Sequence, residues 1–315
     1  MTSSVSRRDW LKGACTAAGA GVLAAAPAAA SEKDQKEPFG FCFNTSTIAG
    51  QKLSIKDEVD IAARAGYQAI EPWIRELDQF VKDGGDLKDL GKRIRDKGLA
   101  VPSAIGFAEW IVDDDGRRKK GLEEAKRSMD LVQQIGGARL AAPPVGATDQ
   151  ADLSLAKAAE RYRALLEVGD KIGVIPQVEV WGFSKSLHRL SETMFVAMES
   201  GHPKACLLPD VYHLRKGGTD FNSVKLLGNA TMYMFHVNDY PAEPGPAELT
   251  DAHRVYPGDG VAPWKTLLRD LRDIGFHGML SLELFNREYW KQDAFEVAKT
   301  GLEKLKGVVQ ASLGQ

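Results

Sequence analysis

The stretch Pro176-Gln177-Val178-Glu179-Val180-Trp181-Gly182 decides which fold this sequence favours. It is an apolar run of strand length that carries a carboxylate near its C-terminal end. Side chains alternate along a strand, so Gln177 and Glu179 face the same side of it. A carboxylate buried in a sheet is costly unless other groups pair with it. Partners for Glu179 must therefore come from other strands.

Three later runs repeat this design, with Asp210 in LLPDVYH, His236 in MYMFHVND and Glu283 in MLSLELFN. Over the whole chain, apolar runs of strand length occur at residues 39–44, 69–73, 100–105, 139–143, 175–181, 205–211, 232–237 and 279–284. Segments with the apolar spacing of a helix lie between them, at 55–65, 87–97, 122–135 and 156–172. Glycines typical of helix ends precede the strands, at Gly66, Gly98, Gly136, Gly173, Gly201, Gly228 and Gly275.

Alternation of strands and helices predicts a parallel sheet, because parallel neighbours need crossover connections. Eight such units, without a further block of domain size, favour an α/β fold with a single (β/α)8 barrel. A doubly wound open sheet is the alternative. That fold usually needs a glycine-rich phosphate-binding turn after its first strand, and residues 44–50 (NTSTIAG) do not form one.

The composition limits the classes of function. The chain has 315 residues, of which 43% are hydrophobic and 27% charged, as in soluble globular proteins. A formal net charge of −2 offers no basic field for nucleic acid. The three cysteines, Cys15, Cys42 and Cys206, have no metal-ligand or paired spacing.

The first 30 residues are predicted to be a leader. The run from Ser6 to Lys12 (SRRDWLK) resembles a twin-arginine export signal, and an Ala/Gly-rich apolar stretch and Ala28-Ala29-Ala30 follow it. A disordered or helical N-terminal extension is the alternative. We expect residues 31–38 to be a flexible tether and 39–315 the barrel. The protein would then be exported, to the periplasm or beyond, with no stable membrane span after the leader is removed.

The C-terminal ends of barrel strands carry the functional groups of such folds. Glu179, Asp210, His236 and Glu283 should therefore meet at one mouth. Any one of them alone would be read as an ordinary buried group satisfied by its neighbours. Four on successive strands instead predict a metal site, because packing three acids together without a cation is costly. Oxygen and nitrogen ligands without a thiolate suit one divalent ion, Mn²⁺, Zn²⁺, Co²⁺ or Mg²⁺.

The same carboxylates suit acid–base chemistry. A carboxylate that binds the ion through one oxygen can use the other to take a proton from a carbon beside a carbonyl. Glu179 and Glu283 come from strands separated by two others, so they would face opposite sides of a substrate. These two residues are the predicted catalytic pair.

The set Glu179, Asp210-x-x-His213, His236 and Glu283 resembles the xylose-isomerase-like superfamily of TIM-barrel sugar isomerases and epimerases, over roughly residues 39–310. The resemblance implies that Glu179, Asp210, His236 and Glu283 bind the metal. It also implies that His213 binds substrate, together with Arg254 in the stretch HRVYPGDG (253–260). Glu71, at the end of residues 69–73, matches a frequent family glutamate that would touch substrate or form a structural salt bridge.

Two features separate this chain from the ketose 3-epimerases. The loop between His236 and Arg254 is longer, and Lys185 stands where those enzymes have a second glutamate. Lys185 or His188 would instead meet an anionic or oxidised sugar. Aromatic residues after the strand ends, Trp181 among them, would wall a sugar pocket or simply pack in the core.

These observations predict a metal-dependent sugar isomerase or epimerase that works by proton transfer through a metal-bound enediolate. Its partner would be a small sugar or keto-sugar, and a homo-oligomer is compatible with the sequence. A lyase or hydratase on keto-sugars or 3-keto-glycosides is the main alternative. A non-catalytic sugar-binding barrel and an endonuclease of the same superfamily fit less well, the latter because removing three basic residues and one acidic residue with the leader lowers the charge from −2 to −4.

Overall fold

The strands and helices of the chain alternate as the sequence predicts. The computed structural model describes residues 38–314, which belong to one compact unit. Within them the strands are β1 Gly40–Asn44, β2 Ala69–Glu71, β3 Arg139–Ala142, β4 Ile175–Glu179, β5 Leu207–Leu208, β6 Met234–Val237 and β7 Met279–Leu282. All of their pairings are parallel. The predictions for the leader and most of the tether concern residues 1–37, which lie outside this part of the chain.

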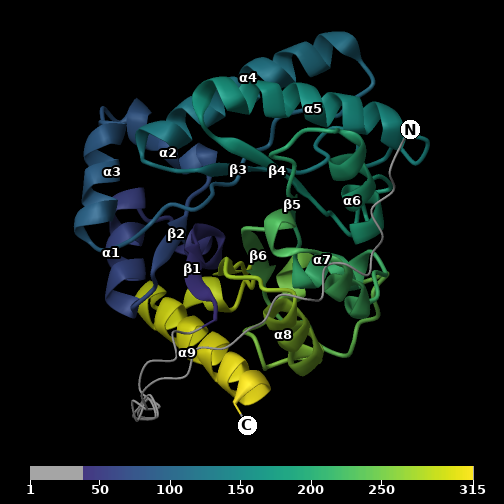
Figure 1. The fold of residues 1–315 in the computed structure, drawn as a ribbon. Coiled ribbons are helices and arrows are strands. Elements are labelled where there is room, and N and C mark those ends of the chain that lie inside the picture. The colour runs from purple at the N-terminus through teal and green to yellow at the C-terminus, as the bar shows by residue number, and fades with distance from the viewer. Residues whose placement is uncertain (1–37, 315) are drawn as a thin grey trace, which may run out of the picture. The chain divides into compact units, whose positions relative to one another are not determined.

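The helices surround these strands (Figure 1). They are α1 Ile55–Ala65, α2 Ile74–Lys82, α3 Leu87–Asp96, α4 Asp115–Gln134, α5 Leu155–Ile172, α6 Leu190–Glu199, α7 Val211–Lys216, α8 Trp264–Asp273 and α9 Ala294–Leu313. Short 3₁₀ turns occur at Thr45–Gln51, Phe221–Leu226, Asn229–Thr231, Asp251–His253 and Tyr289–Lys291. No helix in the described part is long and apolar enough to cross a membrane.

The strands form two arcs, in the order β2-β1-β7-β6 and β3-β4-β5. One junction lies between β5 and β6, where Asp210 bridges His236 and Leu207 bridges Met232. The other is residues 100–105, which bridge β2 at Ala100 and exchange backbone hydrogen bonds with β3 through Ala104. The seven strands and the extended segment 100–105 thus form an eight-membered barrel, and the predicted fold class is confirmed.

The prediction of a regular strand at 100–105 is wrong. This segment is extended, but it makes only isolated β-bridges and no regular ladder of hydrogen bonds. The predicted strand at 205–211 shortens to the two residues of β5. Each segment contains a proline, Pro102 or Pro209, which has no amide hydrogen to donate to a neighbouring strand. Proline therefore interrupts the ladder at both places while the chain stays extended.

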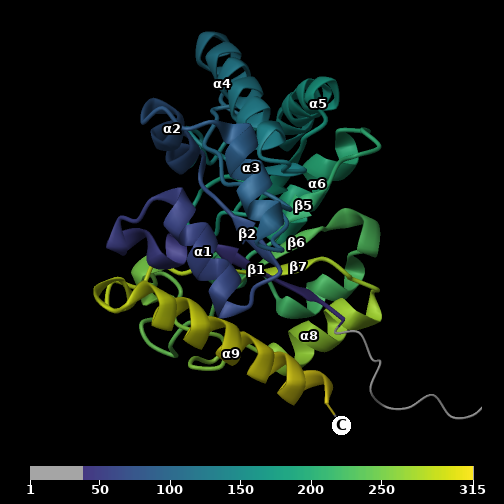
Figure 2. The same ribbon diagram turned by 90° about the vertical axis from the view of Figure 1, so that its left-hand side faces the viewer.

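The helix ends follow the predicted glycines. Six of the seven glycines named above have a positive φ, among them Gly66 at 94° and Gly173 at 88°, where a side chain would be strained. Gly228 is the exception, with φ −110°, and it precedes the turn Asn229–Thr231. The last helix, α9, packs against α1 and α8 (Figures 1 and 2). It joins the two ends of the ring of helices.

Candidate active site

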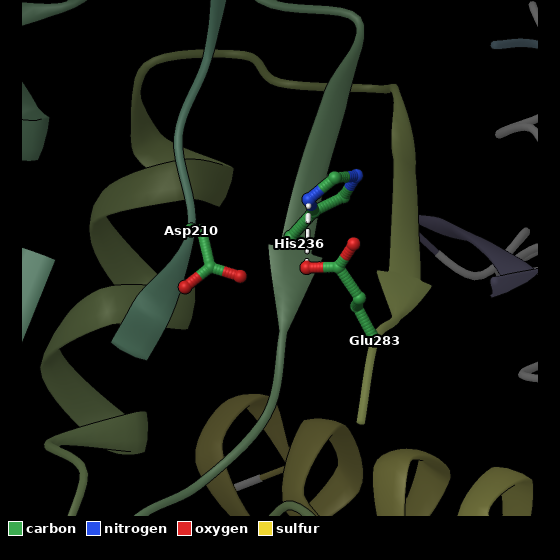
Figure 3. Close-up of side chains that lie close together, drawn as sticks. All are labelled: Asp210, His236 and Glu283. Atoms are coloured by element: carbon green, nitrogen blue, oxygen red, sulfur yellow. Dashed lines mark ion pairs between the residues drawn. The ribbon is translucent and has the colours of Figure 1, made fainter. Parts of the chain in front are cut away.

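Three of the four predicted metal ligands converge at the C-terminal ends of the strands. Asp210, His236 and Glu283 each offer one ligand atom, and these atoms all lie within 4.8 Å of one another. Figure 3 shows the three side chains pointing toward one another from β6 and from the segments that follow β5 and β7. All three are buried. Glu179, the last residue of β4, lies beside this group, with its Oε1 4.0 Å from His236 Nδ1.

Asp210 is fixed by its position as the N-cap of α7. Its Oδ1 accepts the backbone N–H of His213 at 2.8 Å, which satisfies the start of that helix. Its Oδ2 faces the centre of the site and accepts from Asn238 Nδ2 and Arg254 Nη1, both at 2.9 Å. The start of α7 therefore occupies Oδ1 and leaves Oδ2 of Asp210 facing the centre of the site.

Glu71 orients His236, and it does not line the substrate cavity as predicted. Glu71 Oε2 lies 3.0 Å from His236 Nε2 and also accepts from Ser281 Oγ at 2.7 Å and Asn44 Nδ2 at 3.0 Å. Of the two roles that the sequence left open, the geometry matches the salt bridge. With the Nε2 proton directed at Glu71, the Nδ1 lone pair of a neutral His236 points toward Glu283 and Glu179.

His236 Nδ1 has no hydrogen-bond partner although it is buried. It lies 3.3 Å from Glu283 Oε2 in an ion-pair contact (Figure 3). Burial lowers the pKa of His236, but Glu283 and Glu71 outweigh it, so the pKa lies well above its ordinary value. An unpaired imidazole nitrogen among carboxylates fits a divalent cation.

Arg254 is almost completely buried and bonds to the same acids. Its Nη1 donates to Asp210 Oδ2 and Glu283 Oε2, each at 2.9 Å, and its Nη2 donates to Asp251 at 2.7 Å. Burial lowers the pKa of Arg254, but the charges of these acids raise it by more. The pKa is therefore above its ordinary value, and the guanidinium stays cationic. The arginine thus lies inside the site and not on a solvated loop.

Asp239 holds the long loop that delivers Arg254. Its carboxylate accepts from the backbone N–H of Gly258 and Ala262, both at 2.9 Å, and from Trp264 Nε1 at 2.7 Å. Its backbone pairs with Val255, next to Arg254, in both directions at 2.9 Å. Asp239 therefore organises this loop.

His213 presents a hydrogen-bond donor to the cavity. Its Nδ1 accepts the backbone N–H of Gly182 at 3.2 Å, so the neutral ring carries its proton on Nε2. Burial and the nearby charge of Arg254 lower the pKa of His213 well below its ordinary value, which keeps the ring neutral. Nε2 lies 3.3 Å from Arg254 Nη2, and both of these groups are donors. An oxygen between them would be held from two sides.

The two predicted catalytic acids differ in protonation. Burial raises the pKa of Glu283, but His236 and Arg254 outweigh it and lower the pKa to about 2. Burial raises the pKa of Glu179 well above its ordinary value, and the charges of Glu283 and Asp210 add to this. Pairs of acids whose environments push their pKa values apart are typical of acid–base sites. A cation among these acids would favour the ionised form of Glu179.

A cavity of about 270 Å³ opens above these groups. Its lining includes Trp73, Ile105, Phe107, Glu179, Trp181, Phe183, His213, Asp251, Arg254, Glu283 and Phe285. Lys185 is not among them, since its side chain is 60% exposed and pairs with Asp149 at 3.3 Å. His188 pairs with Glu192 at 3.0 Å. Neither basic residue of this loop lines the cavity.

Sequence reasoning missed Asn44, Asn238 and Ser281, each of which donates to a buried acid of the site or to Glu71. Amides and hydroxyls are common at strand ends, so their residue types carry no signal by themselves. Asn44 could nonetheless have been predicted, because it ends the first predicted strand at the same level as the three acids and the histidine of the set.

The fold and the buried acid–histidine cluster define a TIM-barrel protein with an enzyme-like site at its strand ends. The comparison of families is more specific: the chain belongs to the xylose isomerase-like TIM barrel family, whose model matches residues 59–308.

Relatives with assigned activities are enzymes. An inosose isomerase from Bacillus velezensis is 28% identical over 278 residues, which cover 85% of this chain and 96% of that enzyme. A 3-dehydroshikimate dehydratase from Pseudomonas putida is 22% identical over 263 residues, covering 82% of this chain and 41% of that protein. A crystal structure of the IOLI protein with a zinc atom matches with a TM-score of 0.81 and 22% identity, covering 88% of this chain and 100% of that one. Isomerases and dehydratases thus share this fold.

Proposed function

We propose that this protein is a divalent-metal-dependent isomerase or epimerase of sugars or keto-sugars. The observation that carries the proposal is the cluster of Asp210, His236 and Glu283 within 4.8 Å, in which the buried His236 Nδ1 has no hydrogen-bond partner. Glu179 would complete the set of ligands. The zinc atom of the related IOLI structure supports a divalent ion, and the isomerase relative supports the class of reaction.

The ion, when bound, would supply a Lewis acid for the substrate's carbonyl and hydroxyl oxygens. We assign Glu283 as the base, because its carboxylate lines the cavity and is ionised, so one of its oxygens can accept a proton from the substrate. Glu179, which also lines the cavity, would donate a proton of its own to the substrate, so each turnover would leave Glu283 protonated and Glu179 ionised until both exchange with water. Exchange between these two carboxylates would invert or move a C–H bond beside a carbonyl.

His213 and Arg254 would hold the substrate oxygens during this transfer. His213 Nε2 and Arg254 Nη2 are donors 3.3 Å apart, and both residues line the cavity. Negative charge builds on the substrate oxygens as the proton leaves carbon. Donors that are already in place stabilise this charge without reorganisation.

A lyase or dehydratase is the second candidate. The relationship to a 3-dehydroshikimate dehydratase favours it, because elimination begins with the same removal of a proton beside a carbonyl. The two reactions differ in the next step, since a lyase would expel a leaving group instead of returning the proton.

The test is metal analysis combined with solvent-deuterium exchange, using aldoses, ketoses and keto-glycosides with Mn²⁺, Co²⁺ or Zn²⁺. Deuterium incorporation with an isomerised or epimerised product supports the first proposal. Loss of water or of an aglycone supports the second. Metal-independent turnover, or no exchange with any of these sugars, would contradict both.

A further inference from the structure

The positive charge of Arg254 is matched by carboxylates of the protein itself. Its Nε and Nη2 donate to Asp251 Oδ1 at 3.1 and 2.7 Å. Its Nη1 donates to Asp210 Oδ2 and Glu283 Oε2, at 2.9 Å each. Four of the five N–H groups of this guanidinium therefore donate to acids. One N–H, on Nη2, is left for a substrate oxygen.

This hydrogen bonding decides what Arg254 can recognise. Arginine commonly holds a phosphate or a carboxylate with two parallel N–H groups. Arg254 has no such pair free, because Asp251 takes the edge formed by Nε and Nη2. The remaining N–H lies beside His213 Nε2, which is 3.3 Å from Nη2. Two single donors of this kind suit one hydroxyl or carbonyl oxygen, and such an oxygen carries no charge before the reaction.

The rest of the cavity supplies no further positive charge. Its lining is apolar or aromatic apart from Glu179, Glu283, Asp251, Arg254 and the neutral His213. Among the residues that the structure describes, this lining holds no second cation. When Asp210 and the two charges of a divalent ion are included, with Glu179 ionised, the acids still outnumber the positive charges. The site is therefore electrostatically unsuited to a further anion.

Asp251 differs from the other acids that bond to Arg254. Asp210 and Glu283 belong to the cluster that fits the ion, and Asp251 does not. Its side chain is 43% exposed, whereas theirs are buried. It lies in the turn Asp251–His253, three residues before Arg254. Its carboxylate thus offsets the charge of Arg254 and adds negative charge to the cavity without binding the ion.

We propose that Asp251 sets the charge preference of this site. The substrate is then a neutral sugar or keto-sugar, and sugars that carry a phosphate or a carboxylate away from the ketone are disfavoured. The inference rests on the proposed function for the sugar and the ion. An anionic group at the end of the substrate near Arg254 would meet the carboxylate of Asp251 and only one free N–H. Like charges held close together at an interface lower affinity, and a hydroxyl group meets no such repulsion.

Calorimetry on the Mn²⁺-loaded protein tests this preference with two pairs of probes. The pairs are D-fructose with D-fructose 6-phosphate, and dihydroxyacetone with dihydroxyacetone phosphate. Within a pair the hydroxy-ketone is the same and only the phosphate differs. The neutral member should bind at least about 10-fold more tightly at low salt. Added NaCl should reduce this ratio, because Asp251 is partly exposed and its repulsion is screened. A ratio that salt leaves unchanged would indicate a steric cause and overturn the proposal.

Substitutions of Asp251 separate its charge from its contact with Arg254. Asp251→Asn keeps an acceptor oxygen and removes the charge, so the ratio of the two affinities should fall by about 3- to 10-fold. Asp251→Glu keeps the charge and should keep the preference for the neutral member. Asp259→Asn is the matched control, because Asp259 is exposed, pairs with Lys304 and does not line the cavity. An equal loss of affinity for both members in Asp251→Asn would mean that Asp251 only supports Arg254.

Three other outcomes would also overturn the role of Asp251. They are an unchanged ratio in Asp251→Asn, equal or tighter binding of the phosphorylated members, and no binding of any probe. The comparison of probes in the wild-type protein needs no variant and no turnover. A protein that prefers the neutral probes but exchanges no deuterium into them would contradict only the proposed reaction. An active protein that binds the phosphorylated probes equally well would contradict only the role of Asp251.

Discussion

Two regions of the protein bury carboxylates and hold them in opposite states. Between α1 and α2, Glu58 is only 2% exposed, and burial together with the nearby Glu76 raises its pKa to about 10. At the barrel mouth Glu283 is equally hidden, yet its pKa falls to about 2. The difference is the neighbouring positive charge: Arg254, and His236 in its protonated form, contact Glu283, whereas the nearby Arg75 offsets little of the effect on Glu58.

This comparison shows what allows a buried carboxyl group to stay ionised. Burial alone makes a carboxyl group hold its proton, because the ionised form loses its hydration. Glu58 follows this rule, and its Oε2 has no hydrogen-bond partner. The mouth of the barrel instead surrounds its acids with cations and donors from several strands. Cations outweigh burial at Glu283, whereas burial still raises the pKa of Glu179 and Asp210 at the same mouth, as it does for Glu58.

The largest effect should come from removing the ionised oxygen at the mouth. Glu283→Gln keeps an oxygen ligand but cannot accept a proton, so we expect turnover to fall by about 10²–10⁴-fold with part of the metal retained. Steady-state kinetics and metal content per chain check this. Glu288→Gln is the control, because Glu288 is exposed on the following loop. Wild-type turnover in Glu283→Gln would remove Glu283 from the role of base.

The next effect tests the cation that distinguishes the two regions. Arg254→Met keeps an apolar stem and removes the guanidinium, so turnover or substrate affinity should fall by about 10²–10³-fold. Metal content should be intact, because Arg254 is not a ligand. His213→Ala should behave in the same way. Arg272→Met, on the exposed face of α8, is the control. Unchanged kinetics in Arg254→Met would reduce this buried arginine to a structural role.

A smaller effect is expected behind His236. Glu71→Gln removes the charge that holds the Nε2 proton, so metal affinity should weaken by about 10–100-fold. Competition with a chelator measures this affinity, and circular dichroism verifies folding. The Michaelis constant at saturating metal should change little, because Glu71 does not line the cavity. A raised Michaelis constant with unchanged metal affinity would instead indicate that Glu71 binds the substrate.

The smallest effect on activity should come from Glu58, whose change should appear in stability. Its folded-state pKa of about 10 exceeds the ordinary 4.5, so the folded protein binds a proton that the unfolded chain releases. The contribution of Glu58 to stability is then fully present below about pH 4.5 and is lost as pH rises toward 10, by up to about 1.4 kcal/mol per pH unit.

Glu58→Gln should remove this part of the pH dependence and leave turnover unchanged. Urea denaturation of both proteins at pH 5 and pH 8 measures it, with the variant gaining relative stability at pH 8. Glu303→Gln, an exposed change on α9, is the control. An equal stability difference at the two pH values would mean that Glu58 is ionised in the folded protein.

Much of the fold was predictable because strands and helices differ in their apolar spacing. The amphipathic segments at 55–65 and 156–172 correspond closely to α1 and α5. The extended segments that contain Pro102 and Pro209 were less predictable, since an apolar run indicates an extended chain but not its hydrogen bonds. Helix α4 starts at Asp115, earlier than the spacing indicates, because its first turns are polar and exposed.

The site was predictable where position along a strand fixes direction. Asp210, His236 and Glu283 follow this rule, since each lies in or next to a strand. Loop residues do not, because spacing says nothing about depth: Arg254 is buried by the loop that Asp239 anchors, whereas Lys185 extends into solvent. Glu71 was placed at the correct level of the barrel, but its partner could be identified only from the contact with His236.

The pairing of β1 with β7 has a consequence for synthesis of the chain on the ribosome. Cys42 lies opposite Ser281, and Asn44 Nδ2 donates to Glu283 at 3.2 Å, across 239 positions of sequence. One edge of β1 therefore lacks its partner strand, β7, until nearly all of the described residues have been made. Unpaired strand edges attract wrong partners, and such distant pairings form slowly. The candidate site can therefore be completed only after residues 279–283 have been made.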